Sequence, residues 1–193
     1  LNHTMLKVEH LCKIYPNGVQ ALEDVSFTIS EGEFLVVIGL SGSGKSTLLR
    51  CINRLVEPTS GRIEWFGSDV GSYRVDQLGI IRRQIGMIFQ QFNLVKRSSV
   101  LTNVLTGRLG YVPLWVSLLG LWPKAERTRA LNALERLGLA DKASSRADAL
   151  SGGQQQRVGI ARALMQEPKL ILADEPVASL DPVLAHSILG HLE

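Results

Sequence analysis

Residues 39–47, GLSGSGKST, place glycines, hydroxyls and one lysine directly behind an apolar run. The spacing Gly39-x-x-x-x-Gly44-Lys45-Ser46 is typical of a loop that binds phosphate groups. Glycine has no Cβ, so consecutive backbone N–H groups can curve around an anion, and a following helix adds its own free N–H groups. We expect Lys45 to contact the outer phosphates of a nucleotide and the Ser46 hydroxyl to bind Mg²⁺. A nucleotide site is therefore predicted, because an ordinary tight turn needs neither the lysine nor Ser46. The expected contacts to the nucleotide in this loop are Gly39, Ser41, Gly42, Ser43, Gly44, Lys45, Ser46 and Thr47.

Two consecutive acids, Asp174 and Glu175, follow a second apolar stretch at residues 170–173. Neighbouring side chains in an extended chain point to opposite sides, so the two acids can take different roles. We expect Asp174 to lie near Mg²⁺, and Glu175 to orient or deprotonate a water for in-line attack on the γ-phosphate. Two acids that only solvate the end of a strand are the weaker interpretation beside a phosphate-binding loop.

The elements that must position these residues follow from the hydrophobic periodicity. Alternating or continuous apolar runs predict strands at residues 6–9, 25–29, 34–38, 62–66, 85–89 and 170–173. Helical periodicity predicts helices at residues 45 to near 58, 124–137, 153–165 and 182–192. The run Phe34–Ile38 is continuous, as in a strand buried on both faces of a parallel sheet. Strands that alternate with helices, and a helical insertion, predict an α/β domain with a second lobe.

The composition is that of an ordinary globular chain: 193 residues, 45% hydrophobic, with a net charge of +3. The basic residues are scattered, so the charge gives no argument for nucleic-acid binding. Cys12 and Cys51 lack the spacing of a metal site, and Cys51 falls in a helical pattern that predicts a buried thiol. No secretory signal pattern is visible. The most apolar stretch, residues 109–122, is shorter than the ~20 residues of a spanning helix and is interrupted by Pro113 and Gly120.

A third motif carries a resemblance to a known family. The sequence LSGGQ at residues 150–154, followed by QQRV, resembles the signature of ATP-binding cassette (ABC) ATPases. A serine and two glycines that open a helix form a second anion-binding N-terminus. In that family the signature faces the nucleotide of the other subunit, so the resemblance implies a symmetric homodimer that encloses two ATP molecules. It assigns nucleotide contacts to Ser151, Gly152, Gly153 and Gln154.

Other positions match the same family in the expected order. Tyr15 resembles the aromatic residue that stacks on adenine, although a packing aromatic before a turn is the alternative for Tyr15 alone. Gln90 resembles the glutamine that contacts Mg²⁺ and water and relays to a membrane partner, with the adjacent Gln91 a bystander. Asp181, in the sequence Ser-Leu-Asp, resembles the aspartate that crosses the dimer interface. The implied catalytic residues are Glu175, Gln90 and Lys45, and the implied metal ligands are Ser46, Gln90 and Asp174.

The resemblance implies a P-loop NTPase core with an N-terminal antiparallel β subdomain and an inserted α-helical lobe, in one incomplete ABC ATPase domain. Residues 1–96 and 156–193 are expected to form the β subdomain and RecA-like core, and residues 97–155 the lobe with the signature. His186 and His191 fall in the last expected helix and do not match the family's switch histidine. We therefore expect this form of the chain to bind ATP but hydrolyse it poorly, and to aggregate or depend on a partner.

The sequences at residues 85–113 and 117–143 are similar to those of the ATPase subunit of bacterial phosphonate importers. This similarity implies the ATP-binding and hydrolysing motor subunit of an ABC importer for phosphonate or a related phosphorus oxyanion. The implied location is peripheral, on the cytoplasmic face of the bacterial inner membrane. The implied partners are a second ATPase subunit, integral-membrane permease subunits and, indirectly, a periplasmic substrate-binding protein, with no nucleic acid.

Three alternatives stay open. The chain could serve an importer of another small solute such as amino acids, it could be a soluble ABC ATPase that acts on DNA or ribosomes, or it could bind nucleotide without turnover. The interval between Lys45 and Ser151 holds no sustained heptads, which disfavours the coiled-coil proteins of chromosome maintenance. The apolar stretch at residues 109–122, with Trp115 and Trp122, is expected to be lobe core. The alternative is a docking face for the membrane subunit.

Overall fold

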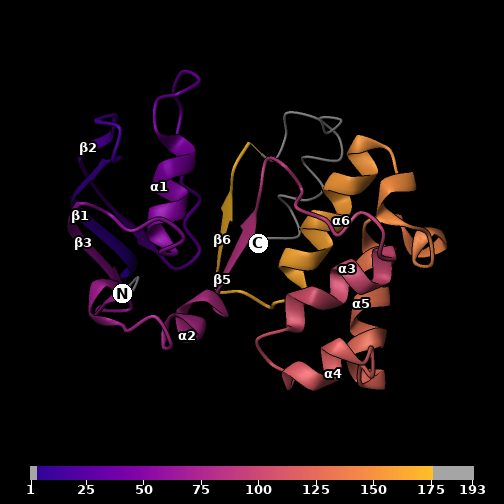
Figure 1. Ribbon diagram of the computed structural model, residues 1–193. Coiled ribbons are helices and arrows are strands. Elements are labelled where there is room, and N and C mark those ends of the chain that lie inside the picture. Colours follow the sequence, from indigo (N-terminus) through magenta and orange to yellow (C-terminus); the bar gives the residue numbers. More distant parts are fainter. Residues whose placement is uncertain (1–3, 176–193) are drawn as a thin grey trace. The chain divides into compact units, whose positions relative to one another are not determined.

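The computed structural model describes residues 4–175 (Figure 1). The chain divides into two compact units, Leu1–Arg82 and Arg83–Glu193, and each is described by itself. The expected helix at residues 182–192, together with Asp181, His186 and His191, lies outside the described residues. Within residues 4–175, no helix combines the length and the hydropathy that crossing a bilayer requires. The expected division into a core and a helical lobe at residues 97–155 remains a prediction.

A four-stranded antiparallel sheet forms the first unit, as the sequence predicts for the N-terminal part (Figure 1). Its strands are β1 (Thr4–Ile14), β2 (Gln20–Ser30), β3 (Ser60–Trp65) and β4 (Ser68–Asp69), in the order β2-β1-β3-β4. The apolar side chains of the central strand β1, among them Leu6, Val8 and Leu11, are at most 1% exposed. Alternation holds for Leu6 and Val8 and then breaks, because an irregularity between Val8 and Leu11 changes the register and brings Leu11 to the buried side.

Helix α1 (Lys45–Ile52) begins at the predicted residue but ends earlier than expected. The chain leaves the helix at Asn53 and takes a left-handed conformation at Arg54 (φ 51°). The Arg54 guanidinium then donates to the carbonyl oxygens of Val70 and Tyr73, at 2.9 and 2.7 Å. These bonds favour the irregular path over a further helical turn. The remaining elements of the unit are the 3-10 turn η1 (Val70–Ser72) and helix α2 (Leu78–Arg82).

Cys51 lies on the buried side of α1 and is completely inaccessible. It is a free cysteine, as the sequence predicts. Burial raises the pKa of its thiol to about 11, because the thiolate would lose its hydration inside the protein.

The prediction of a strand at residues 34–38 is wrong. Residues 33–40 form no strand, and Phe34 and Ile38 are 70% and 90% exposed. An apolar run predicts a preference for burial, but a strand also needs a neighbour that accepts and donates its backbone hydrogen bonds. Neither described sheet supplies such a neighbour for this segment.

The second unit holds a parallel pair of short strands, β5 (Ile85–Ile88) and β6 (Leu170–Ala173), both at their predicted positions. Ile85 pairs with Leu170 and Ile88 with Ala173. The helices of this unit are α3 (Val100–Leu105), α4 (Leu114–Leu118), α5 (Lys124–Arg136) and α6 (Gly152–Leu164), with short 3-10 turns η2 (Thr106–Arg108), η3 (Ala140–Lys142) and η4 (Ala147–Ala149). The predicted helices at residues 124–137 and 153–165 are confirmed within one residue at each end.

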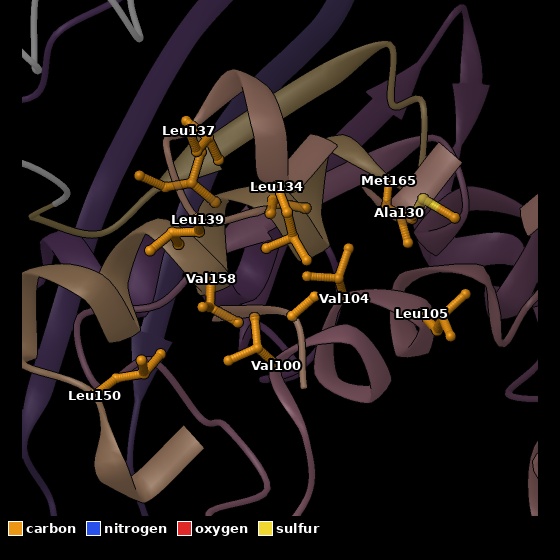
Figure 2. Packing of buried hydrophobic residues seen from close by; sticks show 14 of the residues in the cluster. Val100, Val104, Leu105, Ala130, Leu134, Leu137, Leu139, Leu150, Val158 and Met165 are labelled. Atoms are coloured by element: carbon orange, nitrogen blue, oxygen red, sulfur yellow. The ribbon is translucent and has the colours of Figure 1, made fainter. Parts of the chain in front are cut away.

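The core of the second unit lies where α3, α5 and α6 pack together (Figure 2). Val104, Leu134 and Val158, one from each helix, are fully buried and lie close together in Figure 2. The capping of α3 fixes its entry into this core, because the Ser99 hydroxyl accepts from the Thr102 N–H at 3.1 Å. The helices therefore form one apolar centre, in which α6 is the most deeply buried.

The apolar stretch at residues 109–122 is mainly exposed, so its assignment to the lobe core is wrong for most of its length. Trp115 and Leu118 are 58% and 76% exposed, whereas Val116 is buried and Trp122 packs against the core cluster. Helix α4 has only five residues and can turn just one side chain inward. The remaining apolar side chains of α4 consequently form an exposed surface, which supports the docking-face alternative.

We predict that Leu134→Ala lowers the free energy of unfolding by about 2–5 kcal/mol, because it leaves a cavity among α3, α5 and α6. Leu131→Ala on the same helix is the matched control, since Leu131 is 41% exposed and its loss should cost less than about 1 kcal/mol. Urea unfolding of both variants checks this. Equal losses would contradict the assigned core face of α5.

Candidate functional site

The glycine-rich loop at residues 39–44 lies against strand β2. Gly44, the N-cap of α1, has φ 92°, and a Cβ there would lie 2.1 Å from the carbonyl oxygen of Ala21. A Cβ at Gly39 would meet the Ser43 hydroxyl at 2.6 Å. Only glycine permits both the left-handed backbone and the close approach at position 44. The spacing of the motif thus corresponds to a physical requirement of the fold.

The side chain of Lys45 folds back into the curve of this loop. Its Nζ donates to the carbonyl oxygens of Gly39 and Leu40, at 2.7 and 2.9 Å. The first turn of α1 contains no acidic residue, so nothing there opposes the positive end of the helix dipole. A cation, a curved glycine backbone and a helix N-terminus meet here, and this donor set fits a phosphate group.

Tyr15 lies beside the same helix. Its hydroxyl is 3.3 Å from Oγ1 of Thr47, and Nζ of Lys13 is 5.3 Å from its ring centroid. The turn after β1 holds Tyr15 in place, because its N–H donates to the carbonyl of Val19 and its carbonyl accepts from Gly18. The structure therefore brings the predicted adenine-stacking residue to the predicted phosphate loop. The stacking role itself remains a prediction.

Gln90 and Glu175 meet at the carboxyl ends of β5 and β6. Nε2 of Gln90 donates to Oε2 of Glu175 at 2.8 Å, and the N–H of Asp174 donates to the carbonyl of Ile88 at 2.9 Å. Asp174 is only 3% exposed, whereas Glu175 is exposed. The two acids lie in different environments, but both follow the end of β6 and Glu175 is left-handed (φ 51°), so strand alternation is not the cause. The bond to Glu175 also favours Gln90 over its neighbour Gln91.

Two residues that sequence reasoning missed hold the loop that follows Gln90. The Arg162 guanidinium donates to the carbonyl oxygens of Phe92 and Asn93, at 2.7 and 2.8 Å. Asn103 is 1% exposed, and its Oδ1 accepts from the Val95 N–H at 2.7 Å. A polar residue within the apolar pattern of α3 is a signal for Asn103. Nothing in the sequence distinguishes Arg162 from a solvated helix residue.

The signature motif opens α6 with a capping box. Oγ of Ser151 accepts from the Gln154 N–H at 3.3 Å, and Oε1 of Gln154 accepts from the Ser151 N–H at 3.0 Å. This reciprocal pair stabilises the helix start. Among the described residues nothing would lie within 4 Å of a Cβ at Gly152, so their packing does not require a glycine there.

The remaining predicted positions are distributed as follows. Ser46 belongs to the first unit, whereas Gln90 and Asp174 belong to the second. The predicted magnesium ligand set therefore remains a prediction, and so do the assigned nucleotide contacts. Within residues 4–175, no group of three or more His, Cys, Asp or Glu side chains could hold a metal ion. Asp181 lies outside the described residues.

A phosphate loop, a glycine-led helix and an acidic strand end follow one another along the chain in the order that is typical of an ABC ATPase cassette. The family described as ABC transporter matches residues 22–178, and the chain belongs to this family.

Curated relatives narrow the similarity further. The chain is 56% identical over 193 residues to the phosphonates import ATP-binding protein PhnC of Bdellovibrio bacteriovorus, which covers 100% of this chain and 74% of the relative. It is 54% identical over 188 residues to PhnC 3 of Halalkalibacterium halodurans, covering 97% of this chain and 73% of the relative.

Solved structures confirm the fold. A dimeric structure of MJ0796, a bacterial ABC transporter cassette, is similar with a TM-score of 0.87 and 39% identity, over 97% of this chain and 81% of that one. A dimeric post-hydrolysis structure of the same cassette, bound to ADP and Pi, has a TM-score of 0.84 and 40% identity over the same shares. The mixed α/β class with an antiparallel N-terminal sheet is thereby confirmed.

We predict that Gly44→Ala weakens ATP binding about tenfold or more, because the Cβ would clash with the Ala21 carbonyl and the left-handed backbone disfavours alanine. Gly79→Ala in α2 is the control, because a Cβ there meets nothing within 4 Å. Titration with a fluorescent ATP analogue measures both. Unchanged affinity in Gly44→Ala would contradict the assigned role of the loop.

Proposed function

We propose that this chain binds ATP with Mg²⁺ and hydrolyses it as the motor subunit of an ABC importer. The observation that carries the proposal is the position of Lys45, which is held inside the curve of the glycine loop at the start of α1. A cation in that position has little use in an ordinary turn, and it matches the outer phosphates of a nucleotide.

Each unit contains residues of the kinds that phosphoryl transfer requires. Lys45 and the backbone N–H groups at the start of α1 bind the phosphates. Bound Mg²⁺ would neutralise the charge that develops on the phosphate oxygens, with Ser46, Gln90 and Asp174 as its proposed ligands. Glu175 accepts the proton of the attacking water, and the amide of Gln90 fixes the orientation of that carboxylate.

The nucleotide contacts from the signature are proposed to act across a dimer. Ser151, Gly152, Gly153 and Gln154, at the start of α6, are exposed or half-buried residues. The dimeric cassette structures to which the chain is similar support an assembly of two identical subunits. Asp181 is proposed to complete that interface.

Phosphonate, or a related phosphorus oxyanion, is the proposed cargo of the importer. The support is the similarity to several curated relatives that are named phosphonates import ATP-binding proteins, at 53–56% identity. The proposed partners are permease subunits in the membrane and, through them, a periplasmic substrate-binding protein. The chain would then work at the cytoplasmic face of the inner membrane.

The exposed apolar surface of α4 is the proposed docking site for the permease. Leu114, Trp115, Leu118 and Leu119 are between 58% and 76% exposed. Residues 109–123 contain no charged side chain, whereas Lys124 and Arg127 next to them are exposed. An apolar helix face flanked by acids would complement this surface. A helix that binds anionic lipid would instead carry lysines or arginines on its own polar face.

We predict that Lys45→Ala and Glu175→Gln separate binding from turnover. Lys45→Ala should weaken ATP binding at least about tenfold, because it removes the cation from the loop. Glu175→Gln should retain binding but lower kcat at least about 100-fold, because the amide cannot accept a proton. Equilibrium binding and phosphate release measure the two effects. Full turnover in Glu175→Gln would contradict the assigned base.

We predict that Trp115→Ala weakens assembly with the membrane subunit about 30-fold while ATP binding is kept, because a large exposed aromatic residue is typical of the centre of an interface. Leu131→Ala is the control, since it removes an exposed apolar side chain from α5 instead. Co-purification of the two variants with the permease provides the measurement. Equal recovery with both variants would count against this surface.

A further inference from the structure

Arg162 links α6 to the loop that begins at Gln90. Its two terminal nitrogens donate to consecutive carbonyl oxygens, those of Phe92 and Asn93. Burial lowers the pKa of this guanidinium because its charge has lost part of its hydration. A cation in such a position is kept there by the two carbonyl oxygens that it contacts.

The loop that receives these bonds is held along its whole length. At its start, Gln90 donates to Glu175, and at its end Asn103 bonds both the N–H and the carbonyl of Val95. Between them, Asn93 takes a left-handed conformation with φ 49°, which turns two successive carbonyls towards Arg162. Surface loops are usually mobile, whereas side chains from α3 and α6, Asn103 and Arg162, hold this loop by hydrogen bonds to its backbone.

We propose that Arg162 is a positioning residue that fixes Gln90 relative to the signature helix, so that the glutamine loop and α6 move as one body. The inference rests on the proposed roles of Gln90 and of the signature. An α-helix transmits displacement along its axis as a rigid rod, and α6 carries Ser151 at its start and Arg162 near its end. A shift of the signature, as on dimer closure, is thereby imposed on the loop, and the loop carries the partner of the catalytic carboxylate.

The planar fork of arginine is essential to this role. Two bonds to consecutive carbonyls fix both the position and the orientation of the loop, whereas a lysine ammonium is a point charge on a flexible stem. Arg157 on the same helix provides a contrast. Its Nη1 donates to the carbonyl of Leu137 at 3.1 Å, at the end of α5 and away from the loop.

The test measures the steady-state ATPase kinetics of the protein assembled with its permease. Arg162→Lys should lower kcat about tenfold, with KM for ATP changed less than about twofold, since nucleotide contacts remain while the catalytic geometry loosens. In a Gln90→Ala background the same substitution should have little further effect, because its consequence passes through Gln90. Arg157→Lys, the matched control, should leave kcat unchanged in both backgrounds.

Each outcome decides the matter. If Gln90→Ala lowers kcat and Arg162→Lys lowers it by the same additional factor in both backgrounds, the proposed function stands and the positioning role is overturned. If Gln90→Ala leaves kcat unchanged, the proposed role of Gln90 fails and this inference fails with it. If Arg157→Lys lowers kcat as much as Arg162→Lys does, the effect arises from general stabilisation of α6, and the positioning role of Arg162 is overturned.

A second variant covers loss of folding in Arg162→Lys. Gly159→Val leaves Arg162 intact but adds bulk one helical turn earlier, where even a Cβ would lie 3.9 Å from the Phe92 carbonyl oxygen. It should displace the loop and reproduce both the fall in kcat and the absence of a further effect in Gln90→Ala. An undisturbed kcat in a folded Gly159→Val protein would contradict the proposal.

Discussion

The parallel pairing of β5 with β6 is the constraint on which the candidate chemistry depends. These strands are far apart in the sequence, yet their register places Ile88 opposite Ala173. Both strands therefore end at the same edge of the sheet. Gln90 and Glu175 can therefore form a hydrogen bond across 85 positions of sequence. Because parallel strands need a long crossover, the helices between them are also the elements that hold the loop after Gln90. The pairing of β5 with β6 therefore determines the positions of Gln90 and Glu175 and of the helices that hold the loop after Gln90.

Much of this arrangement could be predicted from the residues. Periodicity located β5, β6, α5 and α6 closely, because each buries one clear face or a continuous apolar run. The glycine loop was predictable for a physical reason, since Gly44 has no room for a side chain beside Ala21.

The incorrect predictions have a common cause. A hydrophobic segment favours burial, but its sequence does not show which other segment will pack against it. Residues 34–38 are apolar but obtain no strand partner in the described structure, and α4 is too short to bury more than one side chain. The anchors Arg162 and Asn103 were missed for a related reason. Their partners are backbone carbonyls and N–H groups of a distant loop, and backbone groups have no signature in the sequence.

The burial of Cys51 has a consequence for the chemical durability of the nucleotide loop. Because burial raises its pKa to about 11, the Cys51 thiol is almost entirely protonated at neutral pH, and the thiolate is the form that reacts with electrophiles and oxidants. The helix that follows the glycine loop therefore carries a sulfur atom that is almost inert. Peroxide or an alkylating agent would reach the half-buried Cys12 on β1 first, and the phosphate-binding segment would be spared.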